Sequence, residues 1–191
     1  MLRVTGGRYL GKKLLCPPGD AVRPTTGLVR ESLFSILGSR LDDARFLDLF
    51  AGSGIVGYEA LSRGAGCVEA VDISLKHCQI LEKNRLNLDL SAAVYHIRCK
   101  DVWQWVLRFI EEDKMQPFDI VFMDPPYLFD LLNPLLEACF AKKILSENGI
   151  LICEHSSKTI LTVSNATCLE TREYGDSALS FFVYPSPSPH P

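Results

Sequence analysis

No uninterrupted apolar run in these 191 residues approaches the roughly 20 residues that a transmembrane helix needs. The first residues reach Arg8 without an apolar core, so we expect no signal peptide and a cytoplasmic protein. The seven cysteines and four histidines are scattered, with no C-x-x-C pair and no metal-ligand spacing. We therefore expect no disulfide framework, no metal site and no membrane partner. Cys67, Cys99 and Cys153 lie in apolar runs, where the sequence predicts small core residues.

The composition has no bias that would indicate disorder, collagen or a coiled coil. Hydrophobic residues make up 47% of the chain and charged residues 23%, which is ordinary for a soluble globular protein. A chain of this length can bury about 70% of the surface that it exposes when unfolded. We expect one main domain with its own core, and we expect a monomer.

Charge is unevenly distributed along the chain. Residues 1–40 contain seven Lys/Arg and two Asp/Glu, a net charge of +5, whereas residues 41–191 contain 13 and 21, a net charge of −8. A basic head on an acidic body indicates that the head contacts a polyanion, although a merely solvated basic face explains the charge equally well. We expect a head at 1–40 made of a small hairpin, a loop and an amphipathic helix, a main domain at 41–184, and a disordered Pro/Ser tail at 185–191.

From residue 44 onward, apolar runs of strand length alternate with helical segments. The expected strands are Arg45–Phe50, Cys67–Ile73, Ala92–Cys99, Phe118–Met123 and Gly149–Cys153. The expected helices lie at about 55–63, 74–88, 101–112 and 130–145. Continuous apolar strands separated by helices predict an α/β fold with a mostly parallel sheet covered on both faces. Cys168–Tyr174 and Ala178–Tyr184 flank a turn and predict an antiparallel hairpin that completes the sheet.

A glycine-rich loop follows the first of these strands. Gly52, Gly54 and Gly57 match G-x-G-x-x-G, and Asp72 lies 20 residues after Gly52, as in dinucleotide-binding proteins. However, Asp48 directly before the loop suits a positively charged ligand better than a pyrophosphate. The loop also fits the D-x-F-x-G-x-G pattern of methyltransferases that use S-adenosylmethionine (SAM), which carries an ammonium and a sulfonium. In both interpretations Asp72 binds ribose hydroxyls, and a purely structural glycine turn stays open as well.

The fourth strand runs directly into Asp124-Pro125-Pro126-Tyr127. Ligands of open α/β sheets bind outside the carboxyl ends of the strands, so this segment is expected on the same rim as the glycine loop. An exocyclic base amine is a poor nucleophile because its lone pair is delocalised. The Asp124 carboxylate and the Pro125 carbonyl can accept its two N–H bonds, while Tyr127 stacks on the base. The prolines fix φ and remove competing donors. A simple turn after a strand is the alternative.

With these motifs the sequence resembles the RsmD family, which methylates N2 of one guanine in small-subunit ribosomal RNA. The resemblance spans about residues 1–184 and rests on the glycine loop, the Asp-Pro-Pro-Tyr segment, and further matching runs. These are Arg3-Val4-x-Gly6-Gly7, Gly11-x-Lys13-Leu14, Arg23-Pro24-Thr25-Thr26, Val29-Arg30-Glu31, Glu59–Ala65 and Tyr174–Ser177. Ser177 stands where the family pattern has threonine, and the Pro/Ser tail has no counterpart.

The resemblance implies a Rossmann-like class I SAM-dependent methyltransferase with a seven-stranded sheet, a C-terminal antiparallel hairpin and a small N-terminal hairpin. It implies SAM as the cofactor, with Asp124, Pro125, Pro126 and Tyr127 as catalytic residues. The implied cofactor-binding residues are Asp48, Phe50, Ala51, Gly52, Ser53, Gly54, Asp72, Ile73, Asp101 and Val102. Asp101 opens a helix and has a second interpretation as an N-cap.

The head is implied to bind RNA, through Arg3, Arg8, Lys12, Lys13, Arg23, Thr25 and Arg30. The partner is then small-subunit ribosomal RNA or the assembled small subunit, and the target is the N2 amine of guanine 966 of 16S RNA. A DNA adenine-N6 methyltransferase is the nearest alternative, followed by a protein glutamine methyltransferase. A module that binds SAM and RNA without turnover and an NAD-dependent oxidoreductase are the remaining alternatives.

Overall fold

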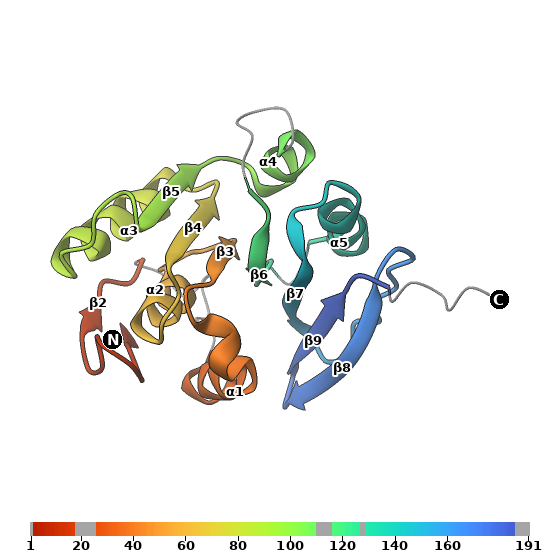
Figure 1. Cartoon of the computed structure of the whole chain (residues 1–191), viewed down its shortest axis with the longest axis horizontal. Coiled ribbons are helices and arrows are strands. Elements are labelled where there is room, and N and C mark those ends of the chain that lie inside the picture. Colours follow the sequence, from red (N-terminus) through yellow and green to blue (C-terminus); the bar gives the residue numbers. More distant parts are fainter. Residues whose placement is uncertain (1, 18–25, 110–115, 127–128, 186–191) are drawn as a thin grey trace.

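The computed structural model describes residues 2–17, 26–109, 116–126 and 129–185. Its centre is a twisted seven-stranded sheet with the order β5-β4-β3-β6-β7-β9-β8 (Figure 1). The strands β3 to β7 pair in parallel, and β9 runs antiparallel between β7 and β8. Their bounds are β3 Arg45–Leu49, β4 Cys67–Asp72, β5 Tyr95–Cys99, β6 Phe118–Met123, β7 Leu145–Ser156, β8 Thr167–Tyr174 and β9 Ser177–Val183.

Helices cover both faces of this sheet, as the apolar strands predict. One face packs against α1 (Gly27–Leu37), α2 (Ile55–Ser62) and α3 (Leu75–Asn87), and the other against α4 (Val102–Arg108) and α5 (Leu132–Ala141). A short 3-10 turn, η1 (Gly38–Leu41), links α1 to the sheet. Each face has its own apolar cluster, and the α/β class with its C-terminal hairpin is confirmed.

Boundaries differ from the predicted ones at a few positions. Phe50 is not part of β3, because its φ of 62° turns the chain into the glycine loop. The strand predicted to end at Cys153 continues as β7 to Ser156, and the helix predicted to 145 ends at Ala141. Cys153 is buried as predicted and Cys67 is half-buried, but the prediction for Cys99 is wrong. Cys99 is exposed because it ends β5, which lies at the edge of the sheet.

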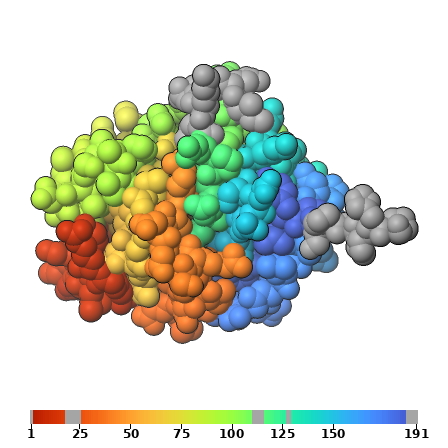
Figure 2. All heavy atoms as spheres, in the orientation of Figure 1, coloured from red at the N-terminus to blue at the C-terminus, as the bar shows by residue number. Residues whose placement is uncertain are grey.

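The head forms the predicted hairpin, in which β1 (Leu2–Arg3) pairs antiparallel with β2 (Lys13–Leu14). Figure 2 shows this hairpin against the side of the molecule, next to the residues of α2 and α3. Its buried Val4 and Leu14 belong to the same apolar cluster as Phe46 of the central sheet. The head therefore shares its core with the sheet. Across the described residues, the structure contains no helix that is long and apolar enough to cross a membrane.

Candidate active site at the carboxyl rim of the sheet

The predicted site residues gather where the parallel strands end. The glycine loop follows β3, Asp72 ends β4, Asp101 follows β5 and Asp124 follows β6. The backbone N–H of Asp124 donates to the carbonyl of Leu49 at 3.4 Å, which joins the ends of β3 and β6. Because the chain leaves β3 toward β4 on one side and β6 lies on the other, this point is the topological switch of the sheet. Ligands of open α/β sheets bind there.

The loop between β3 and α2 needs left-handed backbone at three positions: φ is 62° at Phe50, 55° at Gly52 and 75° at Gly54. Only glycine adopts this region without cost, so Phe50 is a strained residue of the kind that concentrates at functional sites. Position 57 requires glycine for a steric reason, because a Cβ there would lie 3.0 Å from the Val68 side chain. The loop glycines thus shape a ligand-facing turn, and Gly57 allows α2 to pack closely on the sheet.

Asp48 lies beneath this loop and is only 2% exposed. Its carboxylate accepts a hydrogen bond from the backbone N–H of Gly57 at 3.1 Å. Burial raises the pKa of Asp48 to about 7; the Gly57 hydrogen bond lowers it, and the charge of Asp72 raises it. A buried carboxylate that lacks a cationic partner among these contacts suits a ligand that brings positive charge.

Asp72 connects the loop to the next strand end. Its carboxylate accepts hydrogen bonds from the backbone N–H groups of Gly52 and Ser74, both at 2.8 Å, and lies 3.1 Å from the ring of His77. Each carboxylate oxygen can accept more than one hydrogen bond, so this arrangement fixes the side chain and leaves acceptor capacity for a ligand. A role of Asp72 in binding ribose stays a prediction.

The residues predicted to contact adenine differ in their exposure and in their local contacts. Ile73 is 68% exposed, an apolar side chain at the rim where a flat ligand could lie. Asp101 is the N-cap of α4, and one of its oxygens accepts from the backbone N–H of Gln104 at 2.9 Å. Val102 is 3% exposed, so its side chain belongs to the core and only its backbone can face a ligand.

Asp124 stands on the other side of the switch point. Burial raises its pKa well above the usual value, and the charges of Glu154 and Asp48 raise it further. Phe129 contacts Phe50 edge-on, with ring centroids 5.2 Å apart, and so connects the segment after β6 to the glycine loop. Asp124, Pro125 and Pro126 line a pocket at this edge, while Tyr127 lies outside the described residues.

Sequence reasoning missed the contribution of β7 to this pocket. Glu154, His155 and Ser156, at the carboxyl end of β7, line it together with Ser177 at the start of β9. His155 is held by the Ser180 hydroxyl and the Ser156 carbonyl, both at 2.8 Å, and burial lowers its pKa. The signal was available, because charged and polar residues follow an apolar strand here just as Asp124 follows β6. The predicted strand ended at Cys153, and Glu154 was therefore not recognised as a residue at the carboxyl end of a strand.

The predicted RNA-binding residues separate into two groups. Arg3, Arg8, Lys12 and Lys13 are exposed on the N-terminal hairpin, and Arg23 and Thr25 lie outside the described residues. For Arg30 the prediction of a phosphate contact is wrong. Its side chain is 4% exposed and pairs at 2.9 Å with Glu59, which is fully buried. The guanidinium therefore joins α1 to α2 within the fold and does not face RNA.

The chain resembles proteins of known family and structure. The family model described as "Conserved hypothetical protein 95" matches residues 2–183. The Ribosomal RNA small subunit methyltransferase D of Escherichia coli (strain K12) is 37% identical over 153 residues, which are 80% of this chain and 71% of that one. The solved structure of yhhF from Escherichia coli superimposes with a TM-score of 0.83 at 31% identity, over 96% of this chain and 97% of that chain. SMU.776, solved in complex with SAH, shares the fold with a TM-score of 0.68 at 17% identity, over 91% of this chain and 52% of that chain.

Proposed function

This chain belongs to the family of conserved hypothetical protein 95, the RsmD methyltransferases, and we propose that it methylates the N2 amine of one guanine in 16S ribosomal RNA. It is a SAM-dependent ribosomal RNA methyltransferase. The proposal adds the target base and the methylated atom. By family resemblance these are guanine 966 and its N2 nitrogen. The observation that carries it is Asp124 with Pro125 and Pro126 at the end of β6, where the Asp124 backbone N–H donates to the Leu49 carbonyl directly before the glycine loop.

The cofactor half of the rim offers groups that fit SAM. The left-handed turn at Gly52 and Gly54 lets the backbone approach the methionine part, and Asp48 lies beneath it as a counter-charge. We expect Asp72 to accept hydrogen bonds from the ribose hydroxyls, and Ile73 and Asp101 to lie on the adenine side; the hydrogen bond from Gly52 to Asp72 and the exposed Ile73 support this. When bound, SAM supplies a methyl group already activated by the sulfonium, so positioning of the acceptor provides most of the acceleration.

Asp124 positions that acceptor. In the proposed complex the guanine N2 amine donates one hydrogen bond to the Asp124 carboxylate and the other to the Pro125 carbonyl, which directs the nitrogen lone pair toward the methyl group. Transfer of the methyl group from bound SAM to N2 would leave positive charge on the nitrogen, which the Asp124 carboxylate would stabilise. The nitrogen then loses one proton, and Asp124 is the base placed to receive it. A guanine in folded RNA must leave its stack to reach this pocket.

Nucleoside mass spectrometry tests the proposal. The protein is incubated with SAM and small ribosomal subunits from a strain that lacks this methylation, and the RNA is then digested to nucleosides. We expect N2-methylguanosine at one position, and no product with subunits that already carry the modification. Methylation of DNA adenine or of a glutamine side chain instead, or no methylated guanine while SAM still binds, would overturn the proposal.

A further inference from the structure

Glu154 lies beside Asp124 because of the strand register. In the parallel pair β6–β7, Met123, the last residue of β6, is opposite Cys153, so Asp124 directly after β6 comes beside Glu154 of β7. Successive side chains of a strand alternate between faces. Met123 and Cys153 face the α4–α5 side of the sheet, and therefore Glu154, the next residue of β7, faces the opposite side, where its charge acts on Asp124. Both line the same pocket, in which Glu154 is 8% exposed.

Glu154 also lies on the acceptor half of the rim. The glycine loop follows β3, Asp72 ends β4 and Asp101 follows β5, whereas Glu154 lies near the carboxyl end of β7 on the far side of β6. Figure 1 shows β7 separated from β4 and β5 by β3 and β6. In the proposed function this is the half of the rim where the methyl acceptor would bind, and β7 does not neighbour β3, β4 or β5, whose ends carry the groups that fit the cofactor.

We propose that Glu154 is a specificity-determining residue that accepts a hydrogen bond from N1–H of the target guanine. The proposal rests on the proposed function and names what selects its base. Guanine carries two adjacent donors on its Watson–Crick edge, N1–H and the N2 amine, and two adjacent carboxylates match this pair. Adenine and 2-aminopurine have an unprotonated N1, whose lone pair would face the Glu154 carboxylate. A site built to receive a hydrogen bond rejects an analogue that cannot donate it.

The charge arrangement agrees with this role. Two carboxylates side by side in a half-buried pocket repel each other, and this repulsion is one cause of the raised pKa of Asp124. Donors from N1–H and N2–H offset the repulsion only when guanine occupies the pocket. An adenine would leave Glu154 facing a lone pair, which is the mismatch that separates this site from an adenine-N6 methyltransferase.

The test is a change of base preference. Two small-subunit RNAs are prepared by splinted ligation, one with the natural target guanine and one with 2-aminopurine at that position, which keeps the N2 amine and lacks N1–H. Each RNA is assayed both free and reconstituted into small subunits. kcat/KM for methyl transfer is measured for the wild type, Glu154→Gln and Glu154→Ala. The wild type should prefer guanine by about 10²-fold or more. Because the glutamine amide can donate to N1, Glu154→Gln should reverse or abolish that preference, with higher activity on 2-aminopurine than the wild type shows.

Controls separate this role from a structural one. Glu147→Gln makes the same chemical change at an exposed position near the other end of β7 and should leave both rates unchanged. Equal losses on both RNAs in Glu154→Gln, with normal SAM binding and thermal unfolding, would overturn the inference. Should the variants not fold, the wild type still decides, since equal rates on guanine and 2-aminopurine would refute N1–H recognition. A wild type that methylates neither RNA contradicts the proposed function itself and the inference with it.

Discussion

At the scale of single residues, the molecule holds a buried carboxylate whose burial disfavours its charged form. Asp48 is 2% exposed, and the partner shown for it is the Gly57 backbone N–H. Burial raises its pKa to about 7 from an ordinary value of 3.8. Between about pH 4 and 7 the folded state therefore keeps a proton that the unfolded chain has released. The free energy of unfolding falls as the pH rises through this window.

Asp48→Asn removes this titration, so we expect the variant to gain stability over the wild type as the pH rises. The gain should be near zero at pH 4 and reach about 2–4 kcal/mol above pH 7, at about 1.4 kcal/mol per pKa unit. Urea unfolding at a series of pH values measures it, and SAM binding should weaken at the same time. Asp89→Asn, at an exposed aspartate, is the control with no expected effect. Parallel pH profiles for wild type and Asp48→Asn would contradict this account.

At the scale of elements, the strands and helices were predictable because their apolar periodicity is strong. The β6 bounds are identical to the predicted ones, and the rim position of Asp72 and Asp124 follows from strand ends alone. What the sequence concealed were long-range pairings. Arg30 resembled a surface cation, because nothing local shows that Glu59, 29 residues later, meets it at 2.9 Å. Glu154 was missed because the predicted strand stopped at Cys153.

Glu59 is the element-scale connection between the head and the methyltransferase core. It accepts hydrogen bonds from the backbone of Thr5 and from Arg30 and Arg63. Burial raises its pKa, but the Thr5 and Arg63 hydrogen bonds and the charge of Arg30 outweigh it, so that the pKa is lowered. Its stabilisation is thus present above the ordinary value of 4.5 and is lost as the pH falls through the lowered pKa.

Glu59→Gln should cost about 3–5 kcal/mol of unfolding free energy near neutral pH, because it leaves the buried Arg30 without its carboxylate partner. Hydrogen exchange should speed up at the amides of Thr5 and Arg8, which tie the hairpin to α2. Glu170→Gln breaks an exposed pair with Arg172 and should cost less than about 1 kcal/mol. Equal effects of the two substitutions would show that Glu59 does not anchor the head.

At the scale of the whole molecule, the charge asymmetry has a structural counterpart. Arg3, Arg8, Lys12 and Lys13 are exposed on the hairpin, and the head comes close to the glycine loop. Fully buried Asn84 donates to the carbonyls of both Leu15 and Ser53, at 3.0 and 3.3 Å. The head is thus positioned beside the cofactor half of the rim, where RNA phosphates bound to it would bring a flipped base within reach of the pocket.

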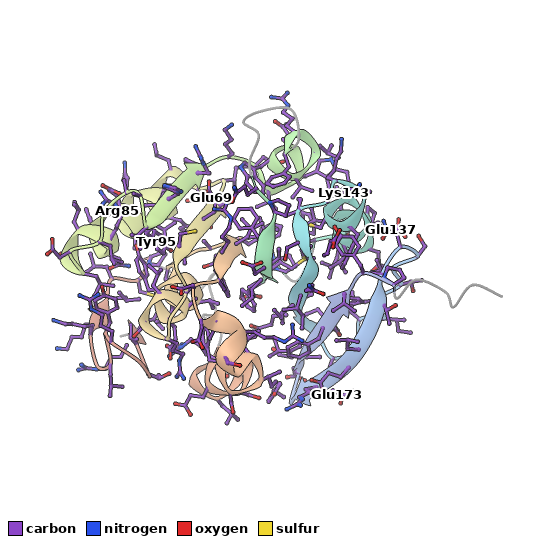
Figure 3. All side chains as sticks on the ribbon, in the orientation of Figure 1. Glu69, Arg85, Tyr95, Glu137, Lys143 and Glu173 are labelled. Carbon is purple, nitrogen blue, oxygen red and sulfur yellow. The ribbon has the colours of Figure 1, made fainter. Side chains whose placement is uncertain are left out.

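Replacing Arg8, Lys12 and Lys13 together by alanine should weaken binding of small-subunit RNA and lower the slope of log K against log salt concentration by about two. SAM affinity should not change. The control replaces Lys142 and Lys143 by alanine. These residues follow α5 on the opposite face, and Figure 3 shows Lys143 there. If the control variant lowers the salt slope as much as the triple variant does, the head is not the RNA-binding surface.

The most direct test of the central claim is single-turnover methyl transfer by Asp124→Asn and Asp124→Ala with SAM prebound. The account predicts that the rate to small-subunit RNA falls by about 10²–10³-fold, since the variants lose the charge that stabilises the developing positive nitrogen. SAM affinity should stay as in the wild type, because Asp124 lies on the acceptor side of the rim. A wild-type rate in either variant would show that Asp124 does not position the amine, and the account would be wrong.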